Sequence, residues 1–371
     1  MHKFSIPLAL LFACGSAVAQ AAASATSAPK PAAAATIAKP ASAASITTLQ
    51  AITVTGVVPG PGLWKVSHGG HVLWVLGVVP TVPDGIRWQP AEVTQAIAGS
   101  QTVIAAPDVK LKVDTNWFGK LFLLLPVRNA QRNPDGKTLA EVLPPALYAR
   151  WQIQKQHYFG GDDSIERYRP ILAASKLLKQ ALKSNGLRSS GKVEDTIKAL
   201  AQQHGVKLVQ PDTTLEIRHP HDAVKAFARQ GPEGIDCFTQ VLDVVEHQIP
   251  AIRARANAWA TGDIETLRGL PGNDYRETCK SALVDAGFAR QLGIDNLPAQ
   301  VESRWLDAAE AALASNAQSF AVLPMHDVLD PRGYLAALQA RGYTVTAPDA
   351  IADADSGMTG NTLPATAAST H

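Results

Sequence analysis

The side chains in this sequence that most readily bind a metal or act as nucleophiles occur as three pairs. His68 and His71 flank two glycines, and His219 and His221 flank a proline. Imidazole nitrogens are common metal ligands, but a metal site needs several ligands that converge on one position. We expect His68 and His71 to lie exposed in a hairpin turn, and His219 and His221 to begin a helix. A surface or capping role therefore competes with metal binding at both histidine pairs.

The third pair consists of Cys237 and Cys279. It remains as an even pair if an N-terminal signal is removed, and such a pair in an exported protein predicts a disulfide. A catalytic cysteine would need a base arrangement that the sequence does not offer, and a zinc site would need more ligands. We therefore predict a Cys237–Cys279 bridge, with Cα atoms within about 7 Å of each other.

The N-terminus predicts export. Lys3 precedes an apolar stretch over residues 4–12, and residues 17–19 read Ala-Val-Ala, a pattern typical of signal-peptide cleavage. We predict a signal peptide over residues 1–19, because the apolar stretch is too short to span a bilayer. No integral membrane span is expected. A lipoprotein attached through Cys14 is the alternative, since Leu-Phe-Ala precedes that cysteine.

Composition divides the remaining chain. Residues 20–47 consist almost entirely of Ala, Ser, Thr, Pro and Lys, which predicts a disordered linker, and the tail over residues 349–371 is similar. Residues 48–348 are then one domain. A formal net charge of +2 with 18% charged residues provides no field suited to nucleic acid.

Hydrophobic periodicity predicts strand–helix–strand units at both ends of this domain and helices in the middle. Strands are predicted at residues 54–57, 63–67, 72–78, 102–106, 205–209, 319–323 and 343–346. Helices are predicted at residues 90–98, 143–156, 165–182, 193–204, 221–229, 237–260, 297–315 and 333–341. Short uninterrupted apolar strands are typical of strands buried on both faces. The predicted fold is therefore α/β (α+β): a central mixed sheet built from the N- and C-terminal halves, with a large helical insert.

Two segments of the predicted sheet carry a family resemblance. Residues 62–80 read GLWKVSHGGHVLWVLGVVP, and residues 320–329 read FAVLPMHDVL, followed by GYLAALQARGYTV over residues 333–345. This layout resembles the TraB/GumN family, relatives of the Tiki proteases, over about residues 62–347. The resemblance implies that each segment is a buried strand running into a Gly-x-x-His turn. It further implies that the two histidines meet to hold a metal.

The resemblance can be carried over position by position. The first turn begins at Gly77 and has Pro80 where the family has its histidine. Ala106 stands where the family has a glutamate after the next strand. Glu216 and His326 match the remaining two ligand positions. Both also have structural interpretations, because Glu216 could accept backbone N–H bonds where a strand leads into a helix, and His326 could hydrogen-bond within its own turn.

Three functions are compatible with this pattern. The leading hypothesis is an exported, periplasmic or secreted pseudoenzyme that needs no cofactor and has a binding or structural role in the cell envelope. Its partner would be an unknown envelope protein or peptide. The alternative is an active hydrolase or protease that has rebuilt a Mn, Co or Zn site from Glu216, His326, Asp108 or Asp327. A third is an accessory of polysaccharide export, suggested by the family name alone. We expect Pro80 and His326 to face one cleft, with Glu216 on its wall.

Overall fold

The computed structural model describes residues 55–113, 129–217, 219–222, 224–225, 234–270, 279 and 296–351. The predicted signal peptide, Cys14 and the linker at residues 20–47 lie outside the described residues, as do the tail beyond residue 351 and part of the predicted helix 221–229. Within the described ranges, no helix is both long and apolar enough to cross a bilayer.

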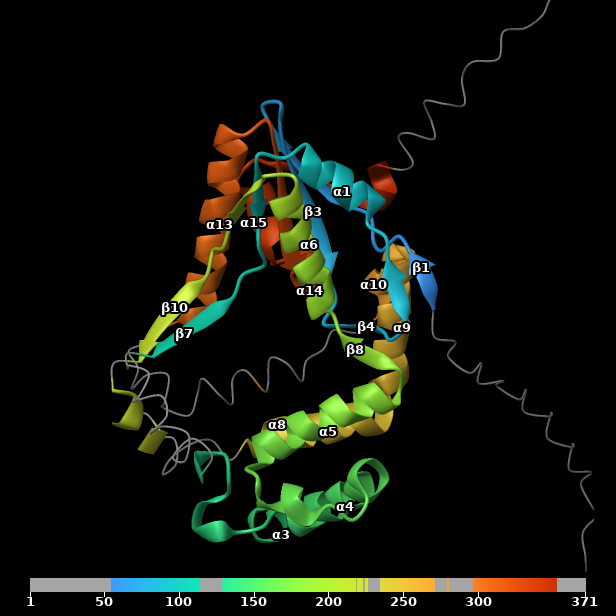
Figure 1. Ribbon diagram of the computed structural model, residues 1–371, viewed down its shortest axis with the longest axis vertical. Coiled ribbons are helices and arrows are strands. Elements are labelled where there is room, and N and C mark those ends of the chain that lie inside the picture. The colour runs from blue at the N-terminus through green and yellow to red at the C-terminus, as the bar shows by residue number, and fades with distance from the viewer. Residues whose placement is uncertain are drawn as a thin grey trace, which may run out of the picture. The chain divides into compact units, whose positions relative to one another are not determined.

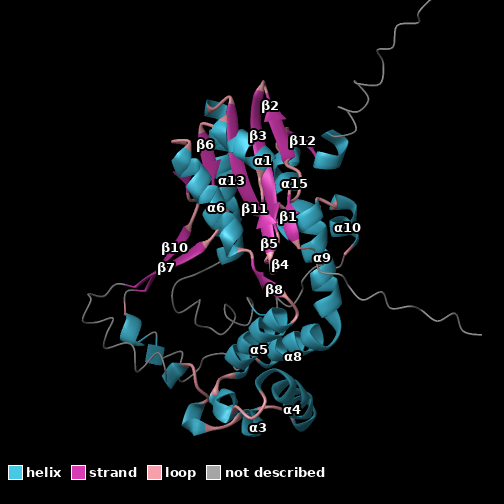
Figure 2. Cartoon of the chain, turned by 45° about the vertical axis from the view of Figure 1, so that its right-hand side comes forward, coloured by secondary structure: helices cyan, strands magenta, loops and turns pink. Residues whose placement is uncertain are grey.

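A six-stranded mixed sheet forms the centre of the α/β part, in the order β12-β2-β3-β11-β6-β9 (Figure 2). Its strands are β2 (Trp64–His68), β3 (His71–Val78), β6 (Thr102–Ile104), β9 (Lys207–Val209), β11 (Gln318–Pro324) and β12 (Thr344–Thr346). Strands β3, β11, β6 and β9 run parallel, while β2 is antiparallel to both of its neighbours. The prediction that strands from both ends of the domain share one mixed sheet is confirmed.

Burial differs between the centre and the edge of this sheet. In β11 the five residues from Ser319 to Leu323 are all buried, as predicted for an uninterrupted apolar strand between two parallel neighbours. The same expectation is wrong for β12, where Thr344 is exposed and Val345 is only half-buried. Strand β12 lies at the edge of the sheet and pairs with β2 alone, so one of its sides is not covered by a further strand.

Two helical layers cover the sheet. Helices α1 (Ala91–Ala98) and α6 (Gly191–Gln203) contact each other, as do α13 (Leu297–Ser315) and α15 (Tyr334–Ala340) (Figure 1). The connection through α1 leads from β3 to β6, and the connection through α6 leads from β6 to β9, so both run towards the β9 edge of the sheet. The connection through α13 runs the other way, from β9 back to β11. Right-handed crossovers in opposite directions place their helices on opposite faces of a sheet. The predicted helix at residues 297–315 is confirmed.

A second core lies in the helical insert. It contains α3 (Leu139–Val142), α4 (Pro145–Phe159), α5 (Pro170–Ser184), α8 (Ile235–Asp243), the π-helix η3 (Val244–Gln248) and α9 (Ile249–Thr261). The single helix predicted at 165–182 is wrong, because a 3-10 helix, η2 (Asp163–Arg167), ends before α5 begins. Arg169 is extended, with ψ at 146°, as the residue preceding Pro170 must be. The helix predicted at 237–260 contains the π-helical turn.

Smaller elements complete the described chain. The strand pairs are β1 (Gly56–Val58) with β5 (Ile86–Trp88), β4 (Thr81–Pro83) with β8 (Leu187–Ser189), and β7 (Val109–Val113) with β10 (Thr213–Ile217). The remaining helices are η1 (Pro134–Gly136), α10 (Ile264–Gly269) and α14 (Met325–Leu329).

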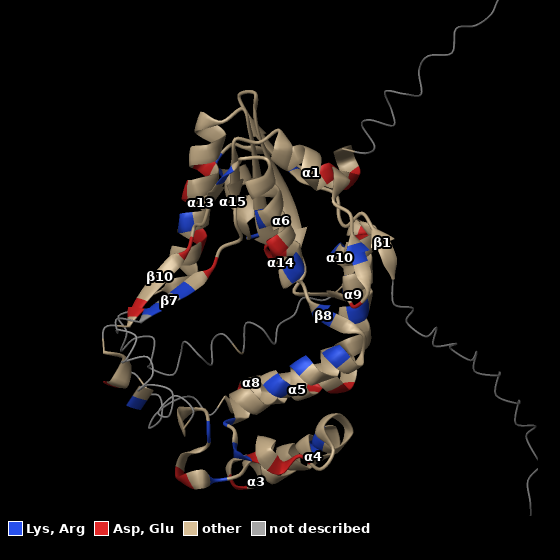
Figure 3. Cartoon of the chain, in the orientation of Figure 1, with Lys and Arg blue, Asp and Glu red and all other residues tan. Residues whose placement is uncertain are grey.

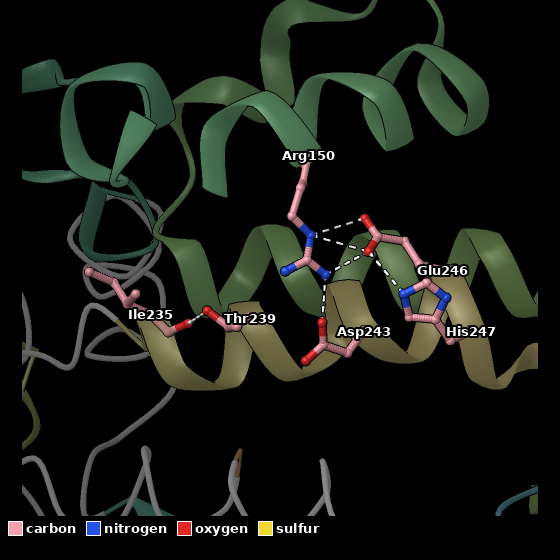
Figure 4. Close-up of polar contacts among 6 residues, drawn as sticks. All are labelled: Arg150, Ile235, Thr239, Asp243, Glu246 and His247. Carbon is pink, nitrogen blue, oxygen red and sulfur yellow. Dashed lines mark hydrogen bonds and ion pairs between the residues drawn. The ribbon is translucent and has the colours of Figure 1, made fainter. Parts of the chain in front are cut away.

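An arginine holds α4 to the helix that contains the π-turn (Figure 4). Arg150 donates from Nη2 to Asp243 Oδ1 at 2.5 Å and to Glu246 Oε2 at 2.6 Å, and from Nε to Glu246 Oε2 at 3.1 Å. These hydrogen bonds, led by the one to Glu246, raise the pKa of Arg150. His247 Nε2 lies 3.7 Å from the same Glu246 oxygen. The charges of Arg150, Asp243 and Glu246 therefore pair with one another, and their role is to hold the two helices together.

Trp259 joins the helical insert to the sheet. This α9 side chain is fully buried in the core of the α/β part, and its Nε1 donates to the carbonyl oxygen of Gly77 in β3 at 2.8 Å. Helix α9 also contacts β4, which pairs with β8. The insert is therefore attached at the carboxyl end of β3.

We expect Trp259→Phe to lower the free energy of unfolding by about 1–3 kcal/mol, because it leaves the buried Gly77 carbonyl without its donor. Urea denaturation of purified protein measures this change. The matched control is Trp88→Phe, because Trp88 Nε1 donates to the Pro59 carbonyl at an exposed site. Equal losses in the two variants would contradict the role assigned to Trp259.

The predicted disulfide is confirmed: Cys237 and Cys279 are bridged, with Cα atoms 4.6 Å apart. Closing a loop of this length stabilises the folded state by up to about 4 kcal/mol through the entropy of the unfolded chain. We expect Cys237→Ala/Cys279→Ala to lose stability in that range, measured by urea denaturation with and without reductant. A reductant effect that is the same in the variant and the wild type would contradict this expectation, as would free thiols at both positions in oxidised protein.

Candidate functional site

The carboxyl ends of β3 and β11 lie side by side. Gly77 pairs with Leu323 and Val78 with Pro324, and α14 directly after β11 contacts β3. The two turns identified from the sequence therefore leave the sheet at the same edge. In open α/β sheets this is the edge at which ligands bind, especially where neighbouring strands connect to opposite faces.

The first turn carries no side chain that could bind a metal. Pro80 has no donor or acceptor in its ring, and its carbonyl oxygen accepts the backbone N–H of Ser190 at 3.2 Å. Val79 is buried at 1% exposure, and the Gly77 carbonyl is occupied by Trp259. The atoms of this turn are engaged in packing and in backbone hydrogen bonds.

The second turn contains His326, close to the start of α14. Its Nε2 lies 3.1 Å from Asp327 Oδ1, and its side chain is 48% exposed. Its carbonyl oxygen accepts the backbone N–H of Asp330 at 2.9 Å. His326 thus interacts with the residue next to it, which matches the structural interpretation of a histidine that bonds within its own turn.

Glu216 is the fourth of the five residues of β10, shortly before the helical residues 220–222. Lys112 of β7 stands directly opposite, and its Nζ donates to Glu216 Oε1 at 2.7 Å. Figure 3 shows the basic positions on β7 and the acidic ones on β10. The pair is exposed, so it contributes little to stability. Glu216 acts as one member of a cross-strand ion pair.

A cleft of about 290 Å³ opens at the carboxyl ends of β6, β9 and β11. Its lining combines apolar side chains with five charged ones. The residues are Val103, Ala105, Ala106, Pro107, Asp108, Lys110, Glu194, Ile197, Lys198, Leu208, Gln210, Asp212, Val322 and Pro324. Ala106 and Asp108 belong to this cleft, whereas Pro80, His326 and Glu216 are not among its lining residues. That Pro80 and His326 face one cleft stays a prediction.

The charged groups of the cleft fall into two sets. Lys110 Nζ donates to Gln210 Oε1 at 2.8 Å and pairs with Asp212, so these three groups satisfy one another. Glu194 and Lys198 of α6 have no hydrogen bond or ion pair through their side chains within the described part of the chain. The cleft therefore presents one acid and one base of α6 without protein partners.

The side chains present do not fit the metal that the family resemblance implies. Among the described residues, no three or more His, Cys, Asp and Glu side chains are grouped so that they could hold a metal ion. Two of the four positions, Pro80 and Ala106, have no ligand atom in the side chain. Of the other two, Glu216 binds Lys112 and His326 binds Asp327.

The histidine pairs do not supply the missing ligands. His68 and His71 face each other across the predicted hairpin, whose turn is formed by Gly69 and Gly70 at φ of 56° and 88°. His71 Nδ1 lies 2.6 Å from the Asn316 carbonyl oxygen. This hairpin closes the amino end of β3, opposite to the edge that carries the two turns.

His219 and His221 are both exposed, next to a helical Pro220. Their placement agrees with a surface or capping role.

Sequence reasoning missed Glu194 and Lys198. Their spacing of four residues, with Ile197 between them, is the ordinary pattern of an amphipathic helix. The sequence contains no signal that distinguishes this turn of α6 from other helical turns, because its role depends on three strands that arrive from distant parts of the chain.

Comparison with known proteins places the chain in one family. The model of the TraB/PrgY/gumN family matches residues 62–347, which is most of the chain. The chain belongs to this family. No curated protein and no solved structure shows a significant match to it.

Gly77 provides a test of how tightly the two turns pack. A Cβ atom added at Gly77 would lie 2.7 Å from Cε and 2.8 Å from Sδ of the buried Met325. We expect Gly77→Ala to lower the free energy of unfolding by about 1 kcal/mol, because Met325 must change rotamer in a filled site. Gly269→Ala is the matched control, since a Cβ there meets nothing within 4 Å.

Met325→Ala should relieve that crowding. In Gly77→Ala/Met325→Ala we expect a destabilisation smaller than the sum of the two single variants, by about 0.5 kcal/mol or more. Thermal and urea denaturation of the four proteins give the coupling energy. Strict additivity would show that Gly77 and Met325 do not share the same space.

Proposed function

We propose that this member of the TraB/PrgY/gumN family is an exported, catalytically inactive protein that acts by binding. The observation that carries this proposal is the shared edge of β3 and β11. There the two turns supply one imidazole, His326, and one carboxylate, Asp327, which already contacts that imidazole, while a ligand-sized cleft lies beside them. The cleft is the binding site in this proposal.

The chemistry of the ligand positions supports the loss of hydrolysis. A catalytic zinc site uses three protein ligands and one open position. Here Pro80 and Ala106 supply none, and the ion pair of Glu216 with Lys112 would have to break before Glu216 could bind a metal. A site with two ligands leaves most of the coordination sphere to water and binds metal weakly.

The position of the cleft supports a binding role. It lies at the carboxyl ends of parallel strands, where α/β proteins bind ligands. Its mixture of apolar walls and a few polar groups is typical of small-molecule sites. Ala106 lies in this lining at the position where the resemblance expects a glutamate. The substitution therefore removes a charge and leaves space.

Export is supported by two independent features. The Cys237–Cys279 disulfide is typical of an oxidising compartment. The N-terminal residues carry the pattern of a signal peptide. A periplasmic or secreted location follows, with an envelope protein or peptide as the macromolecular partner.

Calorimetric titration with Mn²⁺, Co²⁺ and Zn²⁺, alongside a peptide-cleavage assay, tests the proposal. We expect no stoichiometric tight binding and no cleavage by the wild-type protein. His326→Ala should behave as the wild type does, and His157→Ala provides the matched control, because His157 is an exposed histidine of α4. Tight binding of one ion per chain, together with cleavage that only His326→Ala loses, would overturn the proposal in favour of an active metallohydrolase.

A further inference from the structure

We infer that the cleft at the carboxyl ends of β6, β9 and β11 binds a small zwitterion with an aliphatic side chain, that is, a free amino acid of the leucine type. The inference rests on the proposed binding role and names the ligand chemistry of that site. Three features of the lining support it: its apolar wall, its two unpaired charges of opposite sign, and its volume.

The apolar wall comes from all four elements around the cleft. Val103 of β6 and Val322 of β11 are buried, Ile197 of α6 is buried, and Leu208 of β9 is half-buried. Branched aliphatic side chains of this kind offer no hydrogen bond, so they favour an alkyl group over a sugar or a charged body. Burial of a ligand alkyl group against them supplies the hydrophobic part of the affinity.

Glu194 and Lys198 supply the charges. They are one helical turn apart on α6, so they point to the same face, and Ile197 lies between them in the same lining. Neither side chain has a partner within the described chain. Lys198 can therefore donate to a ligand carboxylate, and Glu194 can accept from a ligand ammonium group, with an aliphatic side chain directed at Ile197.

The other charges of the cleft limit the ligand to one carboxylate. Lys110 is held by Asp212 and Gln210, so Lys198 is the lining cation that has no partner among the residues that the structure describes. Asp108 adds a second acid, whose Oδ1 already accepts the N–H of Val109 at 2.8 Å. Such a balance repels polyanions such as nucleotides, because they would face two available carboxylates, those of Asp108 and Glu194, and one available ammonium group.

The volume limits the size of the ligand. A cleft of about 290 Å³ lies at the lower end of the range for small-molecule sites, which begins near 300 Å³. A single amino acid with a branched side chain fits this space. A long peptide or a polysaccharide would need an extended groove.

Isothermal titration of the purified protein with L-leucine tests the inference. Four probes separate the contributions: leucine, 4-methylpentanoate without the ammonium group, isoamylamine without the carboxylate, and glycine without the alkyl group. We expect leucine to bind, and each of the other three to bind at least about ten-fold more weakly, since a charge-assisted hydrogen bond or the buried alkyl group each contributes that factor or more.

Variants of α6 test which residues bind the probe. Lys198→Met and Glu194→Gln should each weaken leucine binding about ten-fold or more, and Ala106→Leu should abolish it by filling the cleft. Lys192→Met and Asp195→Asn are the matched controls, because both positions are exposed on α6 outside the lining. Unfolding midpoints of all variants establish that the exposed substitutions leave the fold intact.

The outcomes separate this inference from the proposed function. No leucine binding up to about 10 mM, equal binding of isoamylamine, or unchanged binding in Lys198→Met and Glu194→Gln would each overturn the zwitterion site. None of these results bears on whether the protein hydrolyses peptides. Metal-dependent cleavage would overturn the proposed function whether or not leucine binds.

Discussion

The parallel pairing of β3 with β11 is the constraint on which the α/β part depends. Seven residues of β11 are in register with β3, and the two strands come from opposite ends of the domain. Because β11 lies between β3 and β6, the sheet cannot close until the C-terminal part of the chain arrives. Such a long-range pairing is slow to form, but it is stabilised by the burial of the five central residues of β11. Its register fixes which residues leave the sheet together.

Several contacts that depend on this register meet at Gly77. Its carbonyl accepts Trp259 from the helical insert, its pairing partner is Leu323, and its missing side chain leaves room for Met325. Three parts of the chain therefore meet around one residue. This edge of the sheet is filled by packing and backbone hydrogen bonds, and a metal centre there would have to displace them.

The neighbouring cleft differs from this packed edge, because some of its charged side chains have no hydrogen-bond partner within the described chain. Lys110, Gln210 and Asp212 are fixed at the base of the β7–β10 pair, while Glu194 and Lys198 face the cleft from α6. Glu194 and Lys198 are both exposed, so water covers their charges until a ligand replaces it. A small amphiphilic ligand offers that cover.

The sequence by itself determined the fold class, the strands of the six-stranded sheet, α13, the disulfide and the family, because each depends on local periodicity, on residue type or on an even cysteine count. The single helix predicted across Pro170 was wrong on a local rule, because a proline excludes a helical conformation of the residue before it. The burial predicted for β12 was wrong because neighbours decide it, and β12 is an exposed edge. The sequence identified Pro80 and Ala106 as positions without ligand atoms, since that requires only their chemistry. The cross-strand ion pair of Glu216 with Lys112, and the cleft formed by α6 with three distant strands, were decided by tertiary structure alone. The physical reason is that a side chain's partner depends on strand register and crossover direction, which no local pattern encodes.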